Sequence, residues 1–580
     1  MLWITIVFSS IWIGYTLIPF FRVNDLNFYS RIFTGWLIGS SITSFAVYIL
    51  NFVLPMGPFL VLVILAAEVF AIVYLQKTGH KSPYSHEKSP WYYFFIIFTA
   101  GVSLKHLSRV YNEVPNLCHS SLMPIMDREL SFINSVLYGV NKRRSNLFFY
   151  SDPMVYGSKF YGYAMPLLFT SVLMSGGLSY GGASIVICFI NTIATSFAIY
   201  QFAKKYTKWP TLASFVFIYL GGWASVLFMR ASHRIDKHND LVHLLSKTHE
   251  TVMYQPLAHI LSLSKSVSFA FTFAQFAILW QPSILSYVLA ALSPSIATSI
   301  ATFGLLAGMP HSVSHLIPFA STILFRLYPF TLNYKPLFRE AEMRGTFFAP
   351  VVIWFIALGP IFIVLAGFSW YLPRNKFKFY FIASAGPFLL LNFFREGTGL
   401  FANSAAIAAT FLPLAVVAFT ELLRKYIDWP TDEEYKGCAL FIATFTFGII
   451  IAGGLICTKR LGESKEQAIG PYEIEAAKWL HEIVPYSEPI LTKSTKLNPT
   501  TLTGHQQYLG DKAELFADGV NLKPKLDEIY SLIDASAKKS EWKALGIKYV
   551  LQNNQEPLNI PVEHQVLKEN NMYSLLEIKD

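Results

Sequence analysis

The distribution of apolar runs divides this chain of 580 residues into two unequal parts. Roughly the first 460 residues form a succession of apolar runs long enough to cross a bilayer, and the remainder has none. Hydrophobic residues make up 53% of the chain and charged residues 14%, and the mean hydropathy is +0.42. An ordinary globular domain carries about 25% charged residues. The sequence therefore predicts an α-helical polytopic membrane protein with a small C-terminal soluble α/β domain.

The basic residues indicate how the chain is oriented. The net charge of +10 would suit nucleic acid, but the Lys and Arg residues lie in short clusters between apolar runs, as the positive-inside rule predicts. Arg22 and Arg31 follow the first run, and Lys77, Lys81 and Lys88 follow the third. We expect both connections in the cytoplasm, the C-terminal domain on the outer side of a cell membrane, and no nucleic-acid partner.

Three regions follow from this pattern. They are N-terminal spans (1–90), a transmembrane core (91–458) with outer loops at 110–180 and 229–266, and the soluble domain (459–580). In the soluble domain the pattern predicts a helix in YEIEAAKWLHEIV, a strand in PILTK, a second helix in KLDEIYSLIDASA, and a closing helix and strand in SEWKALGIKYVLQ. The run at 159–174 is aromatic and weakly amphipathic, which suits a segment that lies at the interface rather than crossing. The total is about 11 to 13 spans, and the stretch broken by Pro and His at 305–326 leaves the exact count open. Spans are expected near 1–20, 32–53, 56–76, 91–108, 182–203, 209–228, 267–282, 285–307, 311–326, 346–368, 379–394, 403–423 and 438–457.

Asp127 and Glu129 are the first candidates for chemistry. They lie in the first outer loop, directly before the helix-like run SFINSVLYG. Two carboxylates at a membrane face can accept a proton from a hydroxyl group or bind a divalent cation such as Mg²⁺ or Mn²⁺. The alternative is a solvated helix start, where acids are favoured by the helix dipole.

The second outer loop is rich in histidine. His233, His238 and His243 are five residues apart, with Asp236 between the first two. Imidazole and carboxylate groups suit a divalent metal, so His233, Asp236 and His238 are candidate ligands. A spacing of five does not place three ligands on one helical face, which favours a hydrated loop instead.

Three further residues interrupt or end apolar runs. His311 and His315 follow a proline in GMPHSVSHLIPF, and ionisable groups at membrane depth usually face a cavity or a partner. Arg395 ends an apolar run on the predicted outer face, where a guanidinium can hold a phosphate by two hydrogen bonds or act as a span-end anchor. The sequence has no Walker loop, GxSxG, HExxH or CxxC motif, which argues against ATP-driven pumps and zincins.

These elements together resemble the GT-C superfamily of integral-membrane glycosyltransferases, in a branch with additional N-terminal spans. The resemblance covers about residues 90 to 580 in order. It rests on MDRELSFINSVLYG, KFYGYAMPLLFTSVL, PLAHILSLSKSVSFAF, GMPHSVSHL and the C-terminal pieces EAAKWLHEIVP, EPILTK, TGHQQYLG and WKALGIKYVL. Relatives often carry Asp followed by His in the first outer loop, whereas this chain has Asp127 and Glu129 and no His there.

The resemblance implies transfer of a sugar from a polyprenyl-phosphate donor to a lipid, glycan or protein acceptor at the outer membrane face. Asp127 or Glu129 would be the catalytic carboxylate, and Arg395 the partner of the leaving phosphate. His259, His311 and His315 would line the substrate cavity.

Two other functions stay open. Intramembrane histidines and broken helices also suit a transporter or lipid flippase, although no two halves of the chain match in hydropathy. An assembly factor could use the C-terminal domain for docking, and it would tolerate loss of every loop carboxylate.

Overall fold

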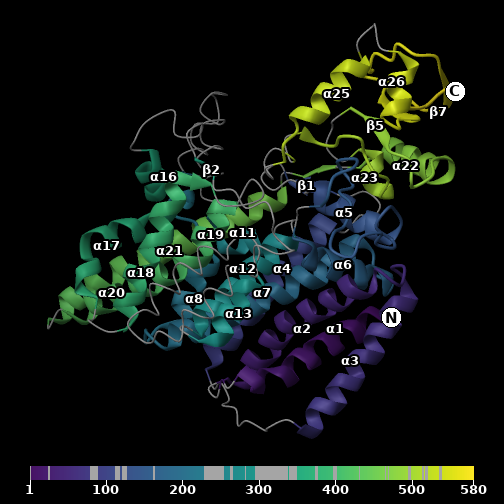
Figure 1. Cartoon of the computed structure of the whole chain (residues 1–580). Helices are drawn as coiled ribbons and strands as arrows, with labels where there is room; N and C mark the ends of the chain where they lie inside the picture. The colour runs from purple at the N-terminus through teal and green to yellow at the C-terminus, as the bar shows by residue number, and fades with distance from the viewer. Residues whose placement is uncertain are drawn as a thin grey trace.

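The computed structural model describes the chain with gaps. The described residues are 2–21, 23, 26–78, 89–111, 118–120, 127–160, 163–227, 254–261, 265–280, 283–293, 337–338, 349–372, 376–395, 402–429, 432–463, 465–467, 469–493, 498–512, 515, 520–533 and 538–579. They form a helical bundle with a small α/β domain at one end (Figure 1). The predicted fold class is confirmed.

The N-terminal helices form a closely packed group. The group consists of α1 (Leu2–Leu17), α2 (Phe28–Leu50) and α3 (Pro58–Thr78). Glycine permits the contact between α1 and α2, because a Cβ on Gly39 would lie 1.6 Å from the Ser10 carbonyl oxygen. The buried Glu68 of α3 accepts hydrogen bonds from Ser9 of α1 and Thr43 of α2. One carboxyl group therefore joins all three helices, which suits a medium without water to hydrogen-bond polar groups.

Helices of the core pack beside this group. α4 (Pro90–Tyr111) and α12 (Lys265–Leu279) both contact α7 (Tyr180–Lys204). Polar residues line the contact between α7 and α12, where Asn191 donates a hydrogen bond to Ser268 at 3.0 Å. The remaining helices of the bundle are α5 (Asp127–Leu137), α6 (Ala164–Ser175), α8 (Pro210–Ile218), α11 (Pro256–Ile260), α13 (Ile284–Ala291), α16 (Ala349–Leu358), α17 (Pro360–Phe368), α18 (Lys376–Phe393), α19 (Ala402–Thr410), α20 (Leu412–Asp428) and α21 (Glu433–Glu463).

Five of the described helices are long and apolar enough to cross a membrane. They are Leu2–Phe21, Phe28–Leu50, Pro58–Lys77, Tyr180–Lys204 and Glu433–Lys459, and a sixth span is possible if the bent pair Ser404–Thr410 and Leu412–Asp428 counts as one. The expected total of 11 to 13 stays a prediction. α6, which covers most of the run expected at the interface, has 12 residues and is too short to cross. It is nevertheless mostly buried against α2 and α5, rather than lying on the surface.

The C-terminal domain is an α/β unit. Its sheet has the order β5-β6-β8-β7, in which β5 (Ile490–Thr492) is parallel to β6 (Tyr549–Asn553) and the other neighbours are antiparallel. The sequence predicted its helices α22 (Pro471–Ile483), α25 (Lys523–Ile533) and α26 (Lys539–Ala544), and strands β5 and β6. The short helix α23 (Pro499–Thr503) and the closing hairpin of β7 (His564–Glu569) and β8 (Tyr573–Ile578) were not predicted.

Two short strand pairs connect distant segments. β1 (Cys118–Ser120) pairs with β4 (Lys465–Gln467), just before the C-terminal domain. β2 (Leu337–Phe338) pairs with β3 (Phe394–Arg395). Because β1 also contacts α4, the C-terminal end of α4 lies on the same side as the C-terminal domain and the start of α4 lies at the other end of the bundle. Residues 79–88 lie outside the described residues, so the predicted separation of the 77–88 connection from the C-terminal domain across the membrane stays a prediction.

Candidate active site

Helix α5 carries the candidate carboxylates, and it is buried. Asp127 is 1% exposed and Arg128 is 3% exposed, whereas Glu129 is partly exposed. Every later residue of α5 is also buried. The burial of Asp127 contradicts the alternative of a solvated helix start for that residue, whereas Glu129 keeps part of its exposure to solvent.

Arg128 finds its partner in the loop that follows α5. Its guanidinium lies 2.6 Å from the carboxylate of Asp152, and both side chains are almost fully buried. Asp152 also accepts a hydrogen bond from the Met154 backbone N–H at 2.9 Å. The guanidinium lies over the ring of Phe160, 5.0 Å from its centroid. Since a buried ion pair tolerates little displacement, it fixes the rotation of α5 and thereby the direction of the neighbouring Asp127.

Glu129 caps a different helix. Its carboxylate accepts hydrogen bonds from the backbone N–H groups of Lys265 at 2.8 Å and Ser266 at 3.3 Å, at the start of α12. The first N–H groups of a helix have no partner inside the helix, and the helix dipole favours a negative charge there. Glu129 thus joins the first outer loop to α12. Residues two apart on a helix differ by about 200° in direction, so Asp127 faces another side of α5 than Glu129.

Lys265 is a buried cation beside this cap. Its side chain is fully buried, with Nζ 5.2 Å from the centroid of the Tyr180 ring of α7, and its charge interacts with that of Glu129. Lys265, Arg128 and Asp152 were not among the site residues predicted from sequence. Lys265 could have been noticed as the one charge at the start of the apolar run SVSFAF. Nothing in the sequence paired Arg128 with Asp152, because that contact depends on the path of the loop.

The C-terminal domain is docked directly on α5. Asn134 of α5 donates a hydrogen bond to the Thr501 carbonyl oxygen of α23 at 2.8 Å. At the end of α5 a Cβ on Gly139 would lie 1.9 Å from the carbonyl oxygen of Gly504, whose φ is +77°. Only residues without a side chain allow two backbones to approach this closely, and the positive φ also favours glycine.

The loop after α5 also contacts the C-terminal domain through its backbone. The N–H of Gln507 donates to the Pro153 carbonyl oxygen and that of Gly510 to the Met154 carbonyl oxygen, both at 2.7 Å. Val155 and Leu509 form an antiparallel bridge. The segment that holds Asp152, the partner of Arg128, is therefore fixed by the C-terminal domain.

His505 supports the same docking segment. Its ring is fully buried and stacked on Tyr486, 4.2 Å between centroids. One ring nitrogen, Nε2, lies 2.9 Å from the Val484 carbonyl oxygen, and the other, Nδ1, lies 2.8 Å from the Thr503 hydroxyl. A neutral imidazole donates to the first and accepts from the second. Burial lowers the pKa of His505 to about 4, so the ring is neutral at physiological pH.

The other candidate residues do not join this cluster within the part of the chain that the structure describes. His259 is fully buried in α11 and stacks on Phe271 of α12. The backbone of Arg395 belongs to β3, and its side chain is outside the described atoms. His233, Asp236, His238, His311 and His315 lie outside the described residues. Among the residues that are described, no group of three or more His, Cys, Asp and Glu side chains could hold a metal ion. The described residues around α5 therefore do not supply the ligand set of a divalent cation.

Bundle and site together define a polytopic membrane protein with an acid-bearing loop helix held beneath a soluble α/β domain. No protein-family model and no curated protein matches the chain. Solved structures that resemble it include an oligosaccharyltransferase of Archaeoglobus fulgidus tethered to an acceptor peptide. It is 14% identical, with a TM-score of 0.43 over 80% of this chain and 69% of that chain.

A second similar structure is ArnT of Cupriavidus metallidurans bound to undecaprenyl phosphate. It is 11% identical, with a TM-score of 0.43 over 84% of this chain and 98% of that chain. Both similarities are at low sequence identity and a TM-score below 0.5, so the resemblance to the GT-C superfamily stays a prediction from the sequence motifs.

Proposed function

We propose that this chain is a membrane glycosyltransferase that moves a sugar from a polyprenyl-phosphate donor to a lipid, glycan or protein acceptor. The observation that supports this most is the position of Asp127. It is a buried carboxylate in the first turn of α5, next to a buried ion pair and beneath a tightly docked soluble domain. A carboxylate in a fixed, largely dry position suits general-base catalysis, because its direction and basicity are set before substrate binds.

In the proposed reaction, the acceptor hydroxyl attacks the anomeric carbon of the sugar. The bond between that carbon and the phosphate oxygen breaks, and the polyprenyl phosphate leaves with the electron pair. The acceptor proton passes to the Asp127 carboxylate. Because negative charge grows on the leaving phosphate, a fixed cation on the donor side lowers the barrier. We assign that role to Arg395, whose guanidinium can hold a phosphate by two hydrogen bonds.

The hydrogen bonds of Glu129 support the choice of Asp127, and not Glu129, as the base. Glu129 is engaged with the N–H groups of Lys265 and Ser266, so its carboxylate holds α12. His259, His311 and His315 are assigned to the substrate cavity by the resemblance. The acceptor, the sugar and the outer-face location are parts of the same proposal.

A transfer assay with defined donors tests this function. The full-length protein in lipid nanodiscs would be incubated with short-chain polyprenyl-phosphate sugars of several kinds and a membrane extract as the source of acceptor. The readout is release of polyprenyl phosphate and movement of labelled sugar to the extract. We expect turnover with at least one donor, and about 10²-fold less with Asp127→Asn, which is the scale of a lost general base.

Two further variants separate catalysis from folding. Asp127→Glu keeps a carboxylate and should retain measurable turnover if Asp127 acts as a base. Asp432→Asn makes the same change at an exposed carboxylate near the start of α21, at the other end of the bundle, and should be neutral. Full activity of a folded Asp127→Asn protein would refute the proposed base. Absence of turnover with every donor in the native protein would favour the transporter or assembly-factor alternatives.

A further inference from the structure

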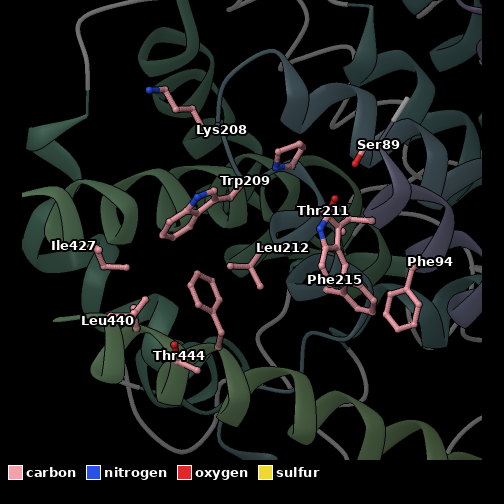
Figure 2. A pocket seen from close by; sticks show the side chains of 14 residues that line it. Ser89, Phe94, Lys208, Trp209, Thr211, Leu212, Phe215, Ile427, Leu440 and Thr444 are labelled. Carbon is pink, nitrogen blue, oxygen red and sulfur yellow. The ribbon is translucent and has the colours of Figure 1, made fainter. Parts of the chain in front are cut away.

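An open groove lies at the end of the bundle away from the C-terminal domain. It is formed where α4 and α8 begin, where α20 ends and along the first half of α21, and its volume is about 610 Å³. This volume is in the range of small-molecule sites, roughly 300 to 1,000 Å³. Figure 2 shows the side chains that line it.

Helix α4 connects the groove to the end of the bundle that carries the C-terminal domain. It runs for 22 residues from the groove at Pro90 to its other end near β1 and the C-terminal domain. At 1.5 Å per residue this is about 33 Å, close to the roughly 30 Å of a bilayer's hydrocarbon core. The groove therefore lies at the opposite end of the bundle from α5 and the candidate active site.

Aromatic side chains form most of the groove wall. Trp91, Phe94, Trp209, Phe215 and Phe447 all contribute, and Trp91 is 67% exposed. Tryptophan is enriched at membrane interfaces because its ring sits at the level of the lipid headgroups. An open groove with an apolar, aromatic wall suits the hydrocarbon chain of a lipid.

The polar part of the lining is cationic. Among the described residues that line the groove, Lys208 carries the one charge, and the hydroxyl groups of Ser89, Thr211 and Thr444 accompany it. In Figure 2 the Lys208 side chain points away from Trp209 and the other labelled aromatic rings. Asp428 follows the lining residue Ile427 in the chain, and its carboxylate oxygen lies 2.5 Å from a guanidinium nitrogen of Arg424, with which it forms an ion pair. The groove thus combines a hydrocarbon wall with a positive charge at its edge.

We propose that this groove binds one membrane phospholipid with an anionic headgroup. An acyl chain would lie against Trp91, Phe215 and Phe447, and the phosphate would lie near Lys208. This binding is independent of the proposed glycosyl transfer, because the groove and Asp127 are on opposite sides of the membrane-spanning bundle.

Lipid retention on the full-length protein tests the proposal. The protein would be purified from nanodiscs that contain equal amounts of phosphatidylglycerol and phosphatidylcholine, and bound lipid would be counted by native mass spectrometry. We expect one phosphatidylglycerol to be retained preferentially. Lys208→Glu should reduce that preference by about fivefold or more, since each basic residue near a lipid surface contributes roughly that factor. Thr444→Phe, at an exposed position of the lining, should fill the groove and reduce retention of both lipids.

Matched controls make these outcomes specific. Lys376→Glu changes an exposed lysine at the start of α18 that is absent from the described lining, and Ile442→Phe enlarges an exposed residue of α21 that is also absent from it. Both should retain the lipid as the native protein does. The proposal is overturned by equal retention of the two lipids, by unchanged retention in Thr444→Phe, or by a polyprenyl phosphate occupying the groove in place of phospholipid.

Discussion

The backbones of Gly139 and Gly504 touch where α5 ends, so that a Cβ on Gly139 would lie 1.9 Å from the Gly504 carbonyl oxygen. One residue belongs to the first outer loop and the other to the C-terminal domain. Their contact holds the domain over the helix that carries Asp127, as do the hydrogen bonds of Asn134, Gln507 and Gly510. Any group added between them must push the domain away from α5.

We therefore expect Gly139→Ala to loosen the C-terminal domain. The clash is with backbone, which cannot move aside as a flexible side chain could, so the cost should be about 2 kcal/mol, typical of overpacking. Faster hydrogen exchange at residues 499–510 of the full-length protein would show it. Gly101→Ala is the matched control, because a Cβ there meets no atom within 4 Å. Equal exchange in both variants would contradict the docking contact.

Because Glu129 caps α12, we expect substitutions of Glu129 and of Asp127 to affect turnover differently. Glu129→Gln keeps an oxygen that can accept from the Lys265 N–H, so it should lower turnover much less than Asp127→Asn does. Glu129→Ala removes the acceptor and should cost about 1 kcal/mol of stability, the usual scale of a lost cap. Turnover and thermal unfolding of the three variants would be compared in the same nanodiscs. A loss of turnover in Glu129→Gln as large as that in Asp127→Asn would mean that both acids act in catalysis.

Because Arg128 and Asp152 form a buried ion pair, we expect the effects of substituting the two residues on stability to depend on each other. Asp152→Asn leaves the Arg128 charge without its counter-ion in a dry position and should destabilise the protein by about 3 kcal/mol or more. Replacing both residues, as Arg128→Met with Asp152→Leu, should recover much of that loss. As a control, Glu563→Gln breaks the exposed pair with Lys579 and should leave the stability unchanged, because water screens the attraction between exposed charges. Additive effects of the two single changes in a double-mutant cycle would argue against a direct pair.

Because the buried His505 ring is neutral, we expect the stability of the folded protein to fall at acidic pH. The folded protein keeps this ring neutral down to its pKa of about 4, whereas the unfolded chain takes up the proton near its usual value of 6.5. The unfolded state binds more protons between those values, so stability is full above about pH 6.5 and falls as the pH drops towards 4. Between pH 7.5 and pH 5 the loss should be about 2 kcal/mol.

Thermal unfolding of the full-length protein as a function of pH would measure this loss. His505→Gln has no titrating group at this position, and it should flatten the pH dependence even if its stability at neutral pH is lower. The same slope in the native protein and in His505→Gln would show that other groups are responsible.

Much of the fold could be predicted from sequence because the conformation of a bilayer-spanning segment depends mainly on its own residues. A long apolar run has to form a helix in order to satisfy its backbone, and the spans at 1–20, 32–53, 56–76 and 182–203 agree with α1, α2, α3 and α7. The helix and strand patterns of the C-terminal domain were local as well, which is why α22 and β5 were predicted. The sequence also located the acids of α5 near its first turn, where the helix dipole favours them.

The tertiary structure alone decided what each charged residue of α5 does. Three consecutive residues begin this helix, and because successive side chains point about 100° apart, they meet different surroundings. Arg128 reaches Asp152, and Glu129 reaches the first N–H groups of α12, some 136 residues further along the chain. Local sequence carries no record of such distant partners. The same holds for Gly139 and Gly504, whose lack of side chains has meaning only once the two backbones meet. Sequence determined which segments are apolar enough to enter a membrane, and packing between distant segments determined that Asp127 lies buried while Glu129 caps the start of α12.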